Sequence, residues 1–319
     1  MNLLTRLVIL SIGLLLPFIG WAAYPERPIK IIVPYTPGGG PDVLARTLAN
    51  VISPRVGQAI IIDNKPGANG TIGIEAIAKS PADGYTIGLV LNSFSMNPGL
   101  YKNIADPVKA FTPIGLIARG TMVLVTRPSL GAKDLQSFVA LSRAKQDGLT
   151  YATPGSASPQ HLATALLGQQ TGVPLMHIPY RGSAPATLAT MAGEVDFTFM
   201  PVHTALPYIK DGKLTPMMVS TLQRSARLPD VPTAEQLGFK DFDVDLWYAV
   251  IAPRGTPAKV VERIRSELEL ALKEPTVIAA FENQGLVPTF LPAAEFTKLL
   301  KTDIVRWGEV IRRAKIKVD

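Results

Sequence analysis

The feature that most constrains the fold is an alternation of short apolar runs with amphipathic helical patterns, which extends from Ile29 almost to the C-terminus. The run "IKIIVPY" predicts a buried strand, and "PDVLARTLANVIS" predicts the helix that follows it. The same order returns in the middle of the chain, where "LTYATP" precedes the helical pattern "PQHLATALLGQQTG". This alternation is typical of α/β proteins with largely parallel sheets.

The first 23 residues stand apart from this pattern. Arg6 supplies a positive start, "LVILSIGLLLPFIG" an apolar middle, and "GWAA" a small-residue cleavage region. Together they predict a secretory signal peptide that is cut near Ala22 or Ala23. An uncleaved membrane anchor is the alternative, although Pro17 and Gly20 interrupt the apolar run and leave it short for a full span. Nothing later in the sequence is apolar and long enough to cross a bilayer, so the expected product is a soluble exported protein.

The composition excludes several kinds of chemistry. The 319-residue chain has no cysteine, which excludes disulfides, thiolate metal sites and a cysteine nucleophile. His161, His177 and His203 are not in a metal-ligand spacing, and the sequence contains no G-x-S-x-G, P-loop or G-x-G-x-x-G motif. The net charge of +7 is spread along the chain without a basic stripe interleaved with aromatics, which argues against nucleic-acid binding. We therefore predict neither a metal nor a cofactor.

Two turns rich in Pro and Gly, "TPGGGPD" and "TPGSASP", each connect a predicted strand to a predicted helix. In α/β sheets ligands sit beyond the carboxyl ends of the strands, and the free N–H groups of a helix N-terminus favour a carboxylate or phosphate. Gly38, Gly39 and Gly40 have no side chains, so their amides can approach such an anion closely. A tight turn that needs positive φ, with Asp42 capping the helix, explains the same residues equally well. Two such units favour two domains that each present a loop and a helix N-terminus.

The second turn and a third one add side chains that could hold an anion. Ser156 and Ser158 offer hydroxyls, although serines before a proline-started helix act more often as caps. The turn in "HIPYRGSAPA" offers Arg181, which could grip a carboxylate or lie in solvent. Ser158 and His161 lie within one helical turn, which leaves a serine hydrolase as an alternative, although no orienting acid accompanies them.

Taken in order, these segments resemble the periplasmic solute-binding receptors of tripartite tricarboxylate transporters, also called Bug receptors. The resemblance is carried by "YPERPIKIIVPYTPGGGPDVLAR", "IIDNKPGANGTIGIEAIAKSPADGYTI", "LTYATPGSASPQHL", "HIPYRGSAPA", "RSARLPDVPTAEQLGF" and "APRGTPAKVVERI", and covers essentially the whole predicted mature chain. It implies a two-domain periplasmic binding protein of the Venus-flytrap, type II-like class, in which each domain is a mainly parallel sheet flanked by helices. In this family a carboxylated solute is trapped between the lobes and passed to membrane permease subunits.

The resemblance also implies which residues contact the ligand. One strand-to-helix loop from each domain grips a carboxylate through amides, hydroxyls and ordered water, and the turn 180–183 lines the cleft. Asp42 is expected to cap its helix and hold the glycine amides, unless the ligand also carries an amine. Departures from the family pattern at Met200, Pro201 and Val202 predict a less polar far end of the ligand, or leave His203 as the polar contact of that wall. The resulting ligand-binding set is Thr36, Gly38, Gly39, Gly40, Asp42, Asn92, Ser93, Gly155, Ser156, Ala157, Ser158, Gln160, Tyr180, Arg181, Gly182, Ser183 and His203.

The expected domain limits are 1–23 for the signal peptide, 24–123 and 245–319 for domain 1, and 124–244 for domain 2, with two crossing strands as a hinge. Asn92 and Ser93, which follow "YTIGLVL", are expected to contact the far end of the ligand. We expect a monomeric, non-enzymatic receptor for a small organic carboxylate, such as a dicarboxylate or an aromatic acid. A sensory receptor for a membrane kinase is the alternative, because it would use the same ligand-induced closure.

Overall fold

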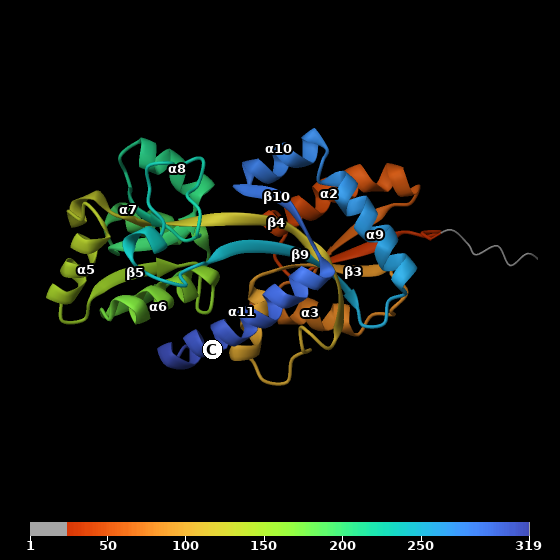
Figure 1. Cartoon of the computed structure of the whole chain (residues 1–319), viewed down its shortest axis with the longest axis horizontal. Coiled ribbons are helices and arrows are strands. Elements are labelled where there is room, and N and C mark those ends of the chain that lie inside the picture. Colours follow the sequence, from red (N-terminus) through yellow and green to blue (C-terminus); the bar gives the residue numbers. More distant parts are fainter. Residues whose placement is uncertain (1–23, 319) are drawn as a thin grey trace, which may run out of the picture.

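The computed structural model describes residues 24–318, so the predicted signal peptide at 1–23 lies outside the described residues. Figure 1 shows two lobes placed end to end and joined by two long strands, β4 (Phe111–Thr126) and β9 (Asp245–Pro253). The first lobe contains the orange elements and the blue ones near them, and the second lobe contains the green elements that lie between these in sequence. Within residues 24–318 we find no helix whose length and apolar character would let it span a bilayer.

The two lobes are built from similar elements. The further strands of the first lobe are β1 (Ile29–Val33), β2 (Ile60–Asn64), β3 (Thr86–Leu91) and β10 (Leu286–Pro292). Its helices are α2 (Gly40–Val56), α3 (Thr71–Ala78), α4 (Ser93–Met96), α9 (Ala258–Ala271) and α10 (Pro275–Asn283). The second lobe contains β5 (Leu149–Thr153), β6 (Leu175–Pro179), β7 (Phe197–Pro201), β8 (Thr215–Val219), α5 (Leu135–Ala144), α6 (Pro159–Thr171), α7 (Ser183–Ala192) and α8 (Val202–Lys210). The last helix is α11 (Ala293–Ala314).

One continuous sheet runs through both lobes in the order β2-β1-β3-β9-β4-β7-β5-β6, with β8 and β10 also paired to β4. The outer strands are parallel, because β1 pairs with β2 and β3, and β5 pairs with β6 and β7. In contrast, β4 is antiparallel to β9 and continues beyond it to pair antiparallel with β7 and β8. The predicted α/β alternation is thus confirmed, and the parallel strands of each lobe adjoin the antiparallel crossing strands.

The crossing brings the carboxyl ends of strands from both lobes together. Along β4, Ala118 is opposite Tyr248, which itself pairs with Leu91 at the end of β3. Further along β4, Met122 is opposite Pro201, the last residue of β7. The stretch of β4 from 118 to 122 spans only about 13 Å of extended chain. The loops that leave the sheets at these ends therefore border the same region between the lobes.

Each lobe has an apolar core of its own. In the first lobe, α2 buries Leu44 and Leu48 in the same cluster as Val33 of β1, as the amphipathic pattern of this helix predicts. In the second lobe, Phe138 and Phe197 pack edge to face with ring centroids 4.9 Å apart. Most of the apolar side chains of each lobe are therefore buried within that lobe.

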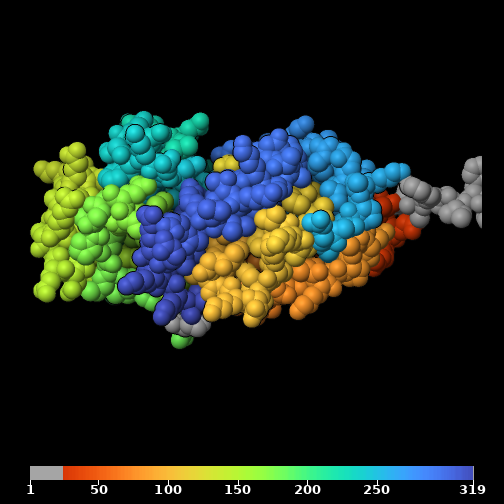
Figure 2. All heavy atoms as spheres, turned by 60° about the horizontal axis from the view of Figure 1, so that its bottom comes forward, coloured from red at the N-terminus to blue at the C-terminus, as the bar shows by residue number. Residues whose placement is uncertain are grey.

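Helix α11 packs on both lobes. Near its start, Phe296 packs against Trp247 of β9 with ring centroids 5.3 Å apart. Near its end, Trp307 is buried in the apolar cluster of the second lobe, and Gln169 Nε2 of α6 donates to the Val310 carbonyl at 3.0 Å. Figure 2 shows this blue helix lying across the orange and the green parts of the molecule. Residues 245–319 are expected in domain 1, and the last turns of α11 also pack on the second lobe, because their apolar side chains are buried there.

Candidate functional site

The first predicted loop lies between β1 and α2, and Asp42 fixes its shape. Gly38 has a φ of +78°, and its N–H donates to Asp42 Oδ2 at 2.9 Å. The same oxygen accepts from Arg46 Nε at 2.9 Å, and Asp42 is only 3% exposed. Burial raises the pKa of Asp42, but the hydrogen bonds from Arg46 and Gly38 outweigh this effect and hold the pKa below its usual range. Asp42 thus holds the glycine segment through the Gly38 amide, as predicted, and this amide is not free for a ligand. The expected capping role is wrong, because the N-cap of α2 is Gly39 and no side chain bonds there.

The next two glycines leave room for close approach. Gly39 is the N-cap of α2 with an ordinary φ of −75°, and its N–H makes only a long 3.4 Å hydrogen bond to the carbonyl of the exposed Thr36. A Cβ on Gly40 would stand 3.4 Å from the Tyr248 hydroxyl and 3.5 Å from Gln284 Oε1. Side chains from β9 and from the end of α10 therefore flank this loop. No local pattern in the sequence singles out Gln284, since it is distant from the loop along the chain.

Asn92 and Ser93, which were expected at the far end of the ligand, are buried with 2% and 1% of their surface exposed. Ser93 Oγ is 2.8 Å from the Tyr35 hydroxyl, and Asn92 Nδ2 donates to the Asp245 carbonyl at 3.2 Å. Asn92 Oδ1 is also buried and has no hydrogen-bond partner among residues 24–318. In this arrangement of the lobes neither side chain is exposed to a ligand, so their contact with one stays a prediction.

The second predicted loop connects β5 to α6 and contains a strained residue. Ala157 is completely buried and has a φ of +61°, in the left-handed region that glycine adopts far more easily. Gly155 nearby has a φ of +149°. Ser158 is the N-cap of α6, as the cap interpretation predicted, and its Oγ accepts the His161 N–H at 3.4 Å. Ser156 is half-buried, so part of its surface is open to a ligand.

The side chains of Ser158 and His161 are not arranged as a nucleophile and its base. Ser158 Oγ donates to the Gly155 carbonyl at 2.8 Å, whereas His161 Nδ1 accepts the Ala157 N–H at 3.1 Å. Burial and the neighbouring His177 lower the pKa of His161 to about 3, which makes the ring a weak base at neutral pH. This geometry gives no support to the serine hydrolase alternative.

The third predicted turn is joined to the second loop through its backbone. The Tyr180 N–H donates to the Thr153 carbonyl at 2.9 Å, and the Gly182 N–H donates to the Pro154 carbonyl at 3.0 Å. Arg181, between these two anchors, is exposed. The structure thus brings the second and third predicted segments together and leaves the guanidinium at the surface.

A small pocket lies where α6, α7 and α8 begin. Gln160 and Ser183 of the predicted set line it, together with Pro154, Pro201 and Thr204. Its volume of 10 Å³ is about the room that one water molecule needs. Helix N-termini carry positive partial charge, so their convergence here favours a negatively charged or hydrogen-bond-accepting group.

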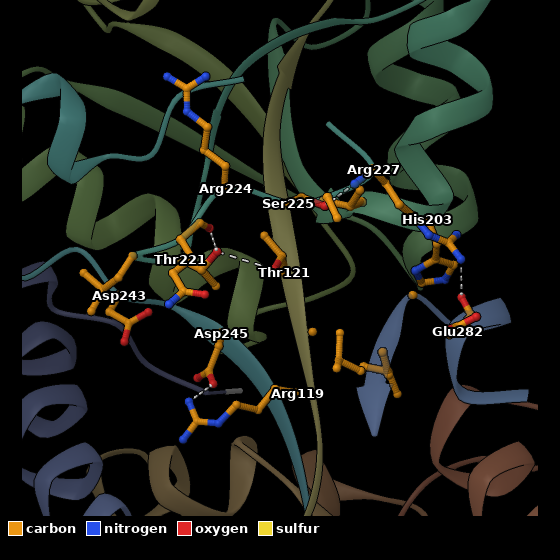
Figure 3. Close-up of a pocket in the computed structure, with 18 residues that line it drawn as sticks. Arg119, Thr121, His203, Thr221, Arg224, Ser225, Arg227, Asp243, Asp245 and Glu282 are labelled. Atoms are coloured by element: carbon orange, nitrogen blue, oxygen red, sulfur yellow. Dashed lines mark hydrogen bonds and ion pairs between the residues drawn. The ribbon is translucent and has the colours of Figure 1, made fainter. Parts of the chain in front are cut away.

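A second, larger groove of about 680 Å³ lies between the lobes, and His203 is one of the residues that line it (Figure 3). Its walls are the loop after β8, which includes Thr221 and Arg227, and the turn from α10 to β10. Arg227 Nη2 donates to the Glu282 carbonyl at 3.1 Å, which joins the two walls. His203 is the member of the predicted set that lines this groove, and its Nδ1 is buried without a partner among the described residues. Burial and the positive charge of Arg227 lower the pKa of His203.

The floor of the groove carries an ion pair between the crossing strands. Arg119 Nη1 of β4 and Asp245 Oδ2 of β9 are 2.6 Å apart. Burial raises the pKa of Asp245 to about 6, although the positive charge of Arg119 opposes this effect. Within residues 24–318, no group of three or more His, Asp or Glu side chains is placed to hold a metal ion.

Comparisons with known proteins agree on one family. A family model described as "Tripartite tricarboxylate transporter family receptor" matches residues 44–316. Protein BugT of Bordetella pertussis is 34% identical over 324 residues, which cover 99% of each chain. Two solved structures from Rhodopseudomonas palustris are also similar. Rpa4515 with adipate has a TM-score of 0.80 at 30% identity and covers 92% of this chain and 99% of its own. MatC with bound malate has a TM-score of 0.77 at 28% identity and covers 90% of this chain and 100% of its own.

Proposed function

This chain belongs to the tripartite tricarboxylate transporter family of receptors, and from that premise we propose that it captures a small organic carboxylate between its two lobes. Membership confirms the resemblance identified in the sequence. The adipate and malate in two of the similar structures support a dicarboxylate as the class of ligand. Receptors of this kind act outside the cytoplasm, in agreement with the export predicted from residues 1–23.

The observation that carries the proposal is the pair of strand-to-helix loops on either side of the crossing strands. Residues 36–39 lead into α2 of the first lobe, and residues 154–158 lead into α6 of the second. Each loop therefore offers a helix N-terminus, where free N–H groups and the helix dipole favour a carboxylate. The amides of Gly39 and Gly40 would bind the ligand from one side, and the Ser156 hydroxyl from the other.

The wall after β7 presents few polar groups to the far end of the ligand. Met200 is buried, and Pro201 has no N–H to donate. The polar side chains that follow are His203 and Thr204, whose Nε2 and Oγ1 atoms are 3.2 Å apart. The far carboxylate of a short aliphatic dicarboxylate would therefore meet the Thr204 hydroxyl and the His203 imidazole rather than a charged side chain.

The lobes would close about a hinge in β4 and β9, near residues 123–124 and 244–245. This placement is supported by the two strands that pass between the lobes and by the separate cores on either side. Helix α11, which packs on both lobes, would slide or bend during closure. A monomeric receptor of this design needs no catalytic step and would hand its solute to permease subunits. Co-purification of a membrane kinase instead of a permease would favour the sensory alternative.

The test of the ligand class is a thermal-shift screen of the purified chain against mono-, di- and tricarboxylates, amino acids, aromatic acids and a neutral sugar. A ligand at a hundred times its Kd stabilises the fold by about 2.7 kcal/mol. We expect the melting temperature to rise with a dicarboxylate. A rise with the neutral sugar and with none of the acids would overturn the proposal.

The test of the first loop is Gly39→Val. Since the φ of Gly39 is −75° and the nearest atom to a new Cβ is the Thr36 carbonyl oxygen at 3.4 Å, the fold should tolerate the side chain, which would obstruct the ligand. Gly308→Val is the matched control, because a Cβ on Gly308 of α11 meets nothing within 4 Å. We expect calorimetric affinity to fall for Gly39→Val only. Equal affinities for the two folded variants would contradict the role of this loop.

A further inference from the structure

Two imidazole rings are stacked beneath the second loop. His161 of α6 and His177 of β6 have ring centroids 3.7 Å apart and ring planes inclined by 25°. His161 is only 7% exposed, and Tyr151 of β5 packs against His177 with centroids 5.0 Å apart. The proposed capture of a carboxylate makes no direct use of either ring. The two rings therefore have no role assigned by ligand contact.

Both rings bond to the loop that they support. His161 Nδ1 accepts the Ala157 N–H at 3.1 Å. His177 Nε2 is 2.6 Å from Thr153 Oγ1, which in turn lies 3.0 Å from the Gly155 carbonyl oxygen. One imidazole thus holds the end of the loop next to α6, and the other holds its start through a hydroxyl. The two contacts enclose Gly155 and Ser156, which belong to the set predicted to bind the ligand.

The contact to Ala157 requires a particular protonation state. An imidazole nitrogen accepts a hydrogen bond only when it carries no proton, so His161 must be neutral with its proton on Nε2. A proton on Nδ1 would point at the Ala157 N–H and remove its acceptor. Because Ala157 is fully buried, its N–H would then lack both the imidazole and water. The left-handed conformation of Ala157 is itself unfavourable, so this hydrogen bond helps to maintain it.

We propose that His161 and His177 are positioning residues, which as a neutral stacked pair hold Gly155–Ser158 in the geometry that binds the ligand. This inference rests on the proposed function for its connection to ligand affinity. The hold on the loop itself does not depend on any ligand.

The surroundings of the pair keep it neutral. Burial, with the neighbouring His177, lowers the pKa of His161 to about 3, and burial lowers the pKa of His177 to about 4. Tyr151 of β5 is an ionisable side chain that packs against the rings, and burial raises its pKa. Phe197 of β7, which packs against Tyr151, carries no charge. Neither can compensate a positive charge on the imidazoles. The loop is therefore held at neutral pH and released only in acid.

The variants that test this inference differ in whether they keep a hydrogen-bond acceptor at the position of His161 Nδ1. His161→Leu fills the space but removes the acceptor, whereas His161→Asn keeps an oxygen near the position of Nδ1. Thr171→Val is the control on the same helix, because it removes a buried hydroxyl that bonds only the Leu167 carbonyl, at 2.7 Å. Hydrogen exchange of the Ala157 amide, measured without ligand, reports the hold on the loop. Calorimetry with malate and with adipate reports its effect on binding.

We expect His161→Leu to speed exchange of the Ala157 amide and to weaken dicarboxylate binding, each by about tenfold or more. His161→Asn should restore both, and Thr171→Val should change neither. Wild-type affinity should stay level from about pH 8 to 6, where the imidazoles stay neutral and the ligand carboxylates stay ionised. Unchanged Ala157 exchange in His161→Leu would overturn the inference, whatever the protein binds. Faster exchange in a protein whose wild type binds no carboxylate would instead refute the proposed function and leave the positioning role intact.

Discussion

The contact between the lobes at Gly285 offers the sharpest test of closure. Gly285 lies in the turn between α10 and β10 of the first lobe, opposite His203 at the start of α8 in the second. A Cβ added to Gly285 would stand 2.1 Å from His203 Nδ1 and 2.7 Å from His203 Cβ. Rotation of the imidazole cannot clear the second of these contacts, because the Cβ atom is the root of the side chain. Gly285→Ala should therefore push the lobes apart.

The magnitude follows from two separate costs. Gly285 has a φ of +66°, so alanine there is strained by roughly 1 kcal/mol even without the clash. Gly57 at the end of α2 has a φ of +69° with nothing within 4 Å of a new Cβ, so Gly57→Ala introduces the backbone strain without any clash. Overpacking against His203 adds about 1–3 kcal/mol. If hinge opening relieves the clash, that energy opposes closure and lowers ligand affinity by roughly 5- to 150-fold.

The assay is calorimetric titration of the dicarboxylate that gives the larger thermal shift, with small-angle scattering to follow the separation of the lobes. Both glycine variants should lose similar stability, but only Gly285→Ala should bind weakly and adopt a more open shape. The double variant with His203→Gly should bind about as tightly as His203→Gly alone, because both clashing atoms, Nδ1 and Cβ, are then absent. Equal affinity in Gly285→Ala and Gly57→Ala would refute the idea that this contact belongs to the ligand-bound arrangement.

Three further predictions concern stability and catalysis. The pKa values of His161 and His177 are lowered to about 3 and about 4, so between those values and about 6.5 the folded chain binds fewer protons than the unfolded chain. Its free energy of unfolding should thus fall as the pH drops from about 6.5, by up to about 1.4 kcal/mol per pH unit for each histidine. In urea titrations this fall should be shallower for His161→Asn, which has lost one of the two imidazoles. An identical fall in the variant would contradict the assignment of the pH dependence to His161. Ser158→Ala should lose about 1 kcal/mol of stability with the cap of α6, while neither it nor the wild type hydrolyses model esters; turnover by the wild type alone would revive the hydrolase alternative. Trp307→Ala on α11 should lower the free energy of unfolding by about 3–5 kcal/mol, and a loss under about 1 kcal/mol in chemical denaturation would show that α11 contributes little to the second lobe.

Local signals in the sequence were enough to predict the units that carry the loops. The apolar run at β1 and the pattern of α2 are each contained in a few consecutive residues, and so is the cap at Ser158. Asp42 could be assigned its anchoring role because its partner, Gly38, is four residues away. Such features depend on neighbours in the chain, and the sequence displays them directly.

Contacts between distant segments could not be predicted in the same way. Nothing near Gly40 in the sequence indicates that Tyr248 and Gln284 flank it, and nothing near His203 points to Gly285. The stack of His161 on His177 depends on α6 and β6 packing in one register. The packing of α11 on both lobes depends on how the lobes are placed relative to each other.

The two loops each satisfy a backbone amide with a side-chain acceptor, but the two acceptors differ in charge. In the first, the carboxylate of Asp42 takes the Gly38 amide, and in the second, the neutral imidazole of His161 takes the Ala157 amide. An uncompensated carboxylate near an anionic ligand would repel it, so the ion pair of Asp42 with Arg46 is what makes the first solution compatible with carboxylate binding. The second loop needs no counter-ion, because its acceptor is neutral. Loss of the Arg46 charge should therefore weaken binding of a carboxylate through repulsion by Asp42, even though Arg46 is not among the residues predicted to contact the ligand.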